Sequence, residues 1–133
     1  MINYKYLVGI FLLILLASCK QEINLDEIYS KETNFKLTIY KGDKYNPDST
    51  ITKTINKYSE ILDNLRLWTS KNSDGWKSST ASWSNPDISL IGSDFRLLIY
   101  NDGVVIAFTD KNGKPIQLVK KVNKSEFDFL TEK

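Results

Sequence analysis

The sequence contains no histidine, a single cysteine and only two arginines. Without histidine, a Ser-His-Asp triad, a Cys-His pair and a histidine-ligated zinc are all excluded. A single cysteine also excludes an intramolecular disulfide and a cysteine-rich metal site. Packing and hydrogen bonds must therefore hold the fold together. We expect no catalytic residue, no metal and no cofactor.

Neither sign of charge is in clear excess. The chain has 18 Lys and Arg against 16 Asp and Glu, a formal net charge of +2. Domains that bind nucleic acid usually carry a marked basic excess. Nucleic acid is therefore not an expected partner.

The sequence also lacks an apolar run long enough to span a membrane. Its long apolar run near the N-terminus, residues 6–17, follows Lys5 and has about 12 residues, whereas a spanning helix needs ~20. This is the length of the apolar region of a signal peptide. The run ends in Leu16-Ala17-Ser18-Cys19, which resembles the lipobox of bacterial lipoproteins. The alternative is an uncleaved apolar anchor beside an ordinary cysteine.

The resemblance implies cleavage after Ser18, a diacylglyceryl thioether on Cys19 and usually an acylated new N-terminus, palmitate included. Membrane lipid would then be a partner, because two or more acyl chains give a stable anchor. The position after Cys19 is Lys20, not the Asp that retains enterobacterial lipoproteins in the inner membrane. We expect an outer-membrane protein, with its periplasmic or surface face left open.

The chain then divides into three parts: a cleaved signal peptide (1–18), a lipidated N-terminus and tether (19–33), and a single domain (34–133). Residues 20–33 are mostly polar and are typical of a solvated tether, which could reach roughly 45 Å when extended. A short helix is the alternative, because Asn24 and Glu27 have the spacing of a capping box. We expect the domain to be monomeric.

The domain is predicted to be α+β, with a single antiparallel sheet of about six strands, one long helix packed on it and a short C-terminal helix. Alternating or β-branched segments mark the strands: 34–40, 50–55, 88–91, 95–100, 104–109 and 116–122. An apolar stripe that includes Tyr58, Leu65 and Trp68 predicts the long helix at 56–69, with Asn56 as its N-cap. Asn123 or Ser125 would cap the last helix, whose inward residues are Phe127 and Leu130.

Two hairpin turns are indicated by Asn101-Asp102-Gly103 and by Asn112-Gly113. Asp-Gly and Asn-Gly pairs favour two-residue turns in which both central residues have positive φ. The strands beside the first turn, 95–100 and 104–108, are apolar on both faces. They should therefore be central, with the helix over one face and something else over the other.

Three tryptophans, Trp68, Trp76 and Trp83, lie within 16 residues. Trp68 completes the helical stripe and should belong to the core. Trp76 and Trp83 stand among Ser, Thr and Asn, where aromatic faces suit a sugar ring or a protein partner. The alternative is that they cap the edge of the sheet. They are the binding residues that the sequence suggests.

Other motifs are weaker. Asp48-Ser49-Thr50 resembles the tripeptide that carries O-glycans on exported Bacteroidota proteins, which would make Ser49 a glycosylation site. Asp110 to Gly113 suggests a calcium loop, but the twelfth position is Lys121 and not the bidentate Glu that an EF-hand needs. The scattered Asp residues lie at turn signals, so no carboxylate pair for hydrolysis is marked.

These observations favour a non-catalytic, lipid-anchored module that holds a protein or glycan at the envelope. A specific version is an immunity or inhibitor lipoprotein that blocks a toxin or hydrolase. The alternative is a structural or assembly accessory of the envelope.

Overall fold

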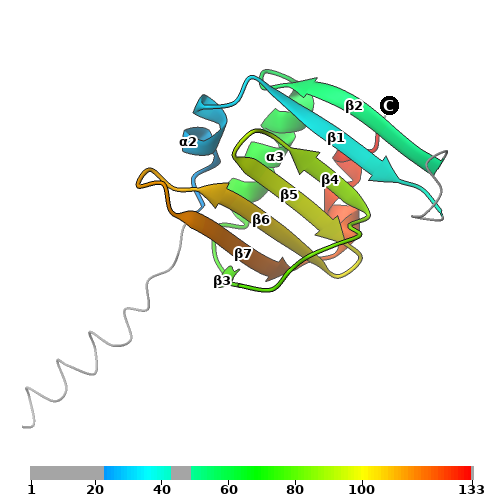
Figure 1. The fold of residues 1–133 in the computed structure, drawn as a ribbon. Coiled ribbons are helices and arrows are strands. Elements are labelled where there is room, and N and C mark those ends of the chain that lie inside the picture. The colour runs from blue at the N-terminus through cyan, green and yellow to red at the C-terminus, as the bar shows by residue number, and fades with distance from the viewer. Residues whose placement is uncertain (1–22, 43–48, 133) are drawn as a thin grey trace, which may run out of the picture.

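Residues 23–42 and 49–132 are described by a computed structural model, and they form one antiparallel sheet with helices on one face (Figure 1). The strands lie in the order β2-β1-β4-β5-β6-β7-β3. Their bounds are β1 (Asn34–Tyr40), β2 (Thr50–Asn56), β3 (Lys77–Ser78), β4 (Ile88–Ile91), β5 (Phe95–Tyr100), β6 (Gly103–Thr109) and β7 (Pro115–Lys121). The helices are α2 (Leu25–Ser30), α3 (Glu60–Lys71) and the 3₁₀ helix η2 (Lys124–Leu130).

The α+β class, the single antiparallel sheet, the long helix and the short C-terminal helix are confirmed. The expected count of about six strands is wrong, because the sheet has seven. The additional strand is β3, in which Lys77 and Ser78 pair with Val119 and Leu118 of β7. Two residues are too few to produce a visible alternation in the sequence.

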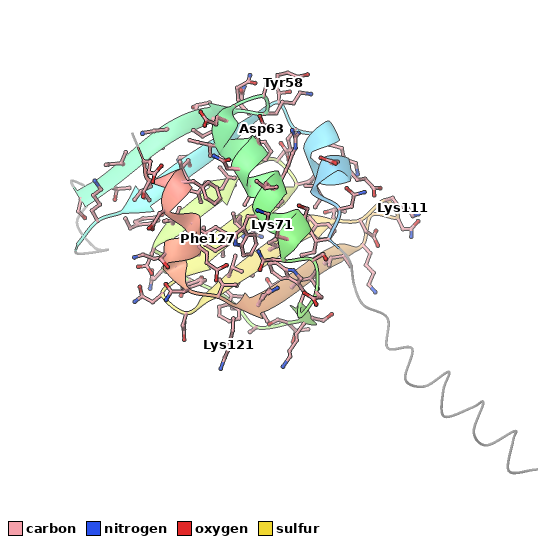
Figure 2. The ribbon with its side chains drawn as sticks, turned by 180° about the vertical axis from the view of Figure 1, so that it is seen from behind. Tyr58, Asp63, Lys71, Lys111, Lys121 and Phe127 are labelled. Atoms are coloured by element: carbon pink, nitrogen blue, oxygen red, sulfur yellow. The ribbon has the colours of Figure 1, made fainter. Side chains whose placement is uncertain are left out.

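The core lies between the sheet and the helices. One row of side chains crosses five neighbouring strands and is no more than 1% exposed: Leu37, Leu90, Leu97, Ile106 and Leu118. Because side chains alternate along a strand, this register places every second residue of each strand on the helix side. Figure 2 shows α3 and η2 over this face, with α2 beside them.

Helix α3 begins later than predicted. Its N-cap is Ser59, whereas Asn56 ends β2 and accepts a hydrogen bond from the main-chain N–H of Tyr58 through Oδ1, at 2.9 Å. The predicted N-cap at Asn56 and the predicted inward Tyr58 are therefore wrong, and Tyr58 is 77% exposed. The turn formed by Asn56 uses the residues that would have made the first helical turn. Leu65 and Trp68 of the stripe are buried as predicted, whereas Ile61 is only half-buried.

The C-terminal helix follows the prediction closely. Asn123 is its N-cap and accepts from the main-chain N–H of Ser125. Phe127 and Leu130 are fully buried against the core. The ring of Phe127 lies 4.5 Å from that of Trp68, centroid to centroid, so η2 and α3 share one aromatic contact.

Much of the predicted tether is part of the folded domain. Ile23 is buried in the core, and α2 follows it. Asp26 in α2 lies 3.3 Å from the Nε of Arg66 in α3. The buried Glu32 accepts hydrogen bonds from the Ser93 hydroxyl and the Asp94 main-chain N–H, both at 2.9 Å. These contacts hold residues 23–33 on the sheet and on α3, where the sequence predicts a solvated tether.

Both hairpins form, but neither has the predicted turn, in which two central residues both have positive φ. Tyr100 pairs directly with Gly103, and neither Asn101 nor Asp102 has a positive φ. The second loop spans residues 110–114, and in it only Gly113 has a positive φ, +76°. The carboxylate of Asp110 accepts the main-chain N–H groups of residues 112 and 114, which closes this longer loop.

Residues 79–87, here called the crossover segment, cover the other face of the central strands. It leads from β3 at one edge of the sheet to β4 near the middle, across β7, β6 and β5 (Figure 1). The side chain of Gln117, on the face away from the helices, donates to the main-chain oxygens of Ser79 and Ala81. The crossover segment therefore lies on the face of the sheet that the helices leave open.

Candidate binding surface

The open face of the sheet carries an aromatic pair. The ring of Trp83, in the crossover segment, lies 5.7 Å from the ring of Tyr100 between centroids, at an interplanar angle of 48°. Tyr100 is the last residue of β5 and belongs to the side-chain row that points away from the helices. Trp83 remains 41% exposed. An amphipathic ring held in place by a second ring is typical of a contact residue for a sugar or a protein.

Beside this pair lies a hollow of about 710 Å³. Its apolar floor includes Val105 and Val119, neighbours in β6 and β7 that share the open face. Charged residues also line it: Lys77, Asp102 and Lys121. An apolar floor with a few polar groups around it is the usual composition of a binding site.

The same face has a second, more polar hollow on the other side of the crossover segment. It has a volume of about 630 Å³ and is lined by residues of that segment, of the β4–β5 turn and of β6 and β7. Ser79, Ser93, Arg96 and Gln117 are among its lining residues. The crossover segment thus divides the open face into an apolar half beside Trp83 and a polar half.

Tyr100 keeps its phenol protonated over a wide pH range. Burial raises its pKa above the ordinary value, and the negative charge of Asp87 raises it further. Its hydroxyl is buried and has no hydrogen-bond partner among the residues that the structure describes. A protonated phenol is a hydrogen-bond donor. The ring of Tyr100 therefore supports that of Trp83, and its hydroxyl is a buried donor that no described residue uses.

Trp76 lies on the helix side of the sheet and is half-buried against the core. Its indole N–H donates to the main-chain oxygen of Asn72 at 2.7 Å, and its ring meets that of Trp68 edge-on at 6.2 Å. The Nζ of Lys120 lies 5.9 Å from the ring centroid of Trp76. The side chain thus packs below the end of α3, although the polar sequence around it gave no periodic reason for burial.

The structure does not bring the two candidate tryptophans together. Trp76 contacts Lys120, which belongs to the row of side chains facing the helices, whereas Trp83 contacts Tyr100, which faces away from them. Successive residues of a strand point to opposite faces. Trp76 and Trp83 therefore lie on opposite sides of the sheet. Tyr100 could not be predicted as the partner of Trp83, because nothing in the sequence shows where the crossover segment lies.

The other suggested sites are placed as follows. Ser49 lies just before β2 and is half-buried, and its main-chain oxygen accepts from the N–H of Lys41 at 2.8 Å. Cys19 and Asp48 lie outside the described residues. Across 23–42 and 49–132, no group of three or more acidic or cysteine side chains has the arrangement of a metal site.

No protein-family model matches the sequence, and no curated protein or solved structure is significantly similar to it. Among the residues with a described structure, no helix is long and apolar enough to cross a membrane.

Proposed function

We propose that this protein is a bacterial lipoprotein, anchored by acylated Cys19, whose domain binds an envelope protein or glycan without catalysing a reaction. The observation that carries the binding role is the exposed Trp83, held on Tyr100 beside an apolar hollow of about 710 Å³. Large exposed aromatic side chains beside such hollows dominate the free energy of many interfaces.

The anchor is supported by the lipobox that ends at Cys19. The Lys at position 20 favours the outer membrane, where the domain would face the periplasm or the cell surface. A small binding domain without cofactors also suits an immunity or inhibitor lipoprotein that blocks a toxin or hydrolase. The alternative role, a structural or assembly accessory of the envelope, would need no exposed aromatic contact, so the exposure of Trp83 favours binding.

The binding role is tested by truncating Trp83 beside a matched control. Leu67 lies on the outside of α3, away from the open face, and is 52% exposed. Trp83→Ala and Leu67→Ala therefore both remove an exposed apolar side chain. We expect the wild type and Leu67→Ala to retrieve the same molecules from detergent-solubilised envelope, and Trp83→Ala to lose them. Equal retrieval by Trp83→Ala would contradict the proposal.

The anchor is tested separately with Cys19→Ala. This variant should stay at precursor size in cells, because the thiol that receives the lipid is gone. Mass spectrometry of the wild type should show acyl chains on residue 19. A Cys19→Ala protein that matures to the wild-type size and still partitions into detergent would refute the lipoprotein assignment.

A further inference from the structure

Strand β2 is an exposed edge of the sheet. It is the outermost strand on its side, beyond β1 (Figure 1). Its seven residues pair with β1 in an unbroken register, and residues 51–54 are all exposed. Edge strands in soluble proteins are usually blunted by proline, by a bulge or by being very short. The strand β2 has none of these features. It carries one charged side chain, Lys53, which is another way in which edges are protected.

The hydrogen bonds on either side of the β1–β2 ladder show which main-chain groups of β2 point away from β1. The N–H of Lys41 donates to the oxygen of Ser49, and the N–H of Lys57 donates to the oxygen of Thr33. Both pairs continue the β1–β2 register. In an antiparallel ladder every second residue bonds to the partner strand. The odd-numbered residues of β2 therefore bond to β1, and Thr50, Thr52 and Thr54 direct their N–H and C=O groups outward.

The described residues of the β1–β2 hairpin carry charge of one sign. The described part of the β1–β2 hairpin, residues 33–42 and 49–57, contains four lysines and no acidic residue. The lysines are Lys36, Lys41, Lys53 and Lys57. This local excess stands out because the whole chain is nearly neutral. The hairpin therefore favours an acidic partner and disfavours a second copy of itself.

The side chains of β2 also specify a pattern. Ile51 and Lys53 are on the helix-side face, yet Ile51 is still 37% exposed and Lys53 is exposed, because the helices do not cover this end of the sheet. The three threonines lie on the opposite face. A strand added beside β2 would place one side chain against Ile51 and another, two residues along, against Lys53. An apolar residue and a carboxylate would match these two positions.

We propose that the free edge of β2 is a docking site for an extended, acidic segment of a partner protein, which adds to the sheet as an eighth strand. Main-chain hydrogen bonds to Thr50, Thr52 and Thr54 would supply affinity, and Ile51 and Lys53 would select the sequence. The proposal rests on the proposed binding role and names a protein segment as one ligand. It places that segment on a different surface from Trp83.

The probe is a synthetic peptide of the repeat Val-Thr-Glu-Thr, here called the Glu-Val peptide, which puts a Val and a Glu two residues apart on one face of a strand. In the control, here called the Lys-Val peptide, Lys replaces each Glu. Each is titrated into the ¹⁵N-labelled mature chain from residue 19 in detergent micelles. The Glu-Val peptide should shift the amide signals of Thr50, Thr52 and Thr54 and slow their hydrogen exchange. Binding should weaken as salt rises from ~0.05 to ~0.5 M, because the charges are exposed. The Lys-Val peptide should produce neither change.

Two variants test the edge directly. Thr52→Pro removes one outward N–H and leaves the bonds to β1, so it should weaken peptide binding about tenfold or more, whereas Thr52→Val should retain it. Lys53→Glu should reverse the preference between the two peptides, and this test stands even if Thr52→Pro does not fold. Equal binding by all of these variants would overturn the proposal.

The remaining outcomes are also decisive. Trp83→Ala should bind the Glu-Val peptide as the wild type does, so a failure at one surface is distinguishable from a failure at the other. Peptide-induced shifts confined to the hollow beside Trp83 would refute docking at β2. A dimer in sedimentation experiments, with Thr52 and Thr54 amides protected in the absence of peptide, would show that a second copy occupies the edge.

Discussion

At the residue scale, Glu32 is the clearest case of a side chain with one defined task. It is 4% exposed and accepts two hydrogen bonds at the β4–β5 turn, from Ser93 and Asp94. Burial alone would raise the pKa of Glu32, but these hydrogen bonds outweigh it and hold the pKa below the ordinary value of 4.5. The ionised carboxylate therefore fastens the segment before β1 to the sheet.

This arrangement predicts a pH dependence. Because the pKa of Glu32 is lower in the folded state, the unfolded chain takes up a proton first as the pH falls. The stabilisation is thus complete above pH ~4.5 and is lost as the pH falls through the folded-state pKa. Glu32→Gln should lower the free energy of unfolding at pH 7 by about 1.5–3 kcal/mol. In urea melts from pH 7 to pH 2, the gap between wild type and variant should narrow, and a constant gap would contradict this account.

Gly92 is tied to the same contact. A Cβ built on Gly92 would lie 2.6 Å from the Cδ of Glu32, so alanine there must displace the carboxylate. Gly92→Ala should therefore destabilise the wild type and have little effect in a Glu32→Ala background, where the atoms that the new Cβ would meet are gone. A double-mutant cycle measures this coupling, and simple additivity of the two changes would show that they act independently.

At Gly113 the backbone conformation, and not packing, disfavours any other residue. Its φ is +76°, yet a Cβ added to Gly113 would have no other atom within 4 Å. The strain of a substitution would come from the left-handed backbone alone, which costs roughly 1–2 kcal/mol and more for a β-branched residue. Gly113→Val should lower stability in urea melts by about that amount or more, and Gly113→Asn by clearly less. Equal melts for Gly113→Val and the wild type would contradict the turn.

At the element scale, α3 offers a matched pair of leucines. Leu65 is 1% exposed in the stripe over the sheet, whereas Leu67 is 52% exposed. Leu65→Ala should cost ~2–5 kcal/mol through lost burial and a cavity. Leu67→Ala should change stability by less than ~0.5 kcal/mol. Chemical denaturation of both variants measures the difference, and similar values would show that α3 is not packed as described.

The crossover segment shows how an irregular element can define a surface. It has no strand or helix, and Asn85 within it adopts a φ of +54°, which Asn tolerates better than most residues. Its position depends on contacts with other elements, namely the hydrogen bonds from Gln117 and the packing of Trp83 on Tyr100. The shape of the binding surface therefore depends on β5 and β7 as much as on the segment itself.

At the scale of the whole molecule, the folded unit extends close to the proposed anchor. Only three residues separate Cys19 from the buried Ile23. At no more than ~3.6 Å per residue, the lipidated cysteine would lie within about 15 Å of Ile23. The domain would therefore sit near the membrane surface and not at the end of a 45 Å tether.

The same contacts predict the effect of truncation. A chain that begins at Asn34 loses the burial of Ile23 and the hydrogen bonds of Glu32. It should be less stable by about 3 kcal/mol or more than a chain that begins at Lys20. Thermal and urea unfolding of the two chains measures this. Equal stability would mean that residues 23–33 contribute nothing to the fold.

Local sequence patterns were enough to predict most elements and the sidedness of the sheet. Alternation in β1, the turn signals between β5, β6 and β7, and the stripe through Leu65 are such patterns, and each reports which face of one element is buried. The buried positions of Phe127 and Leu130 followed in the same way. The lipobox, which consists entirely of neighbouring residues, likewise gives the proposed anchor.

Features that depend on residues distant in the chain emerged only from the tertiary structure. The pairing of β3 with β7, the burial of Ile23 and the contacts of Glu32 with a turn about 60 residues away leave no local period. Trp76 and Trp83 lie on opposite faces of the sheet for the same reason, since each ring is positioned by a partner on another element. Local patterns fix which side of an element is apolar, but only the assembled sheet fixes which neighbour that side meets.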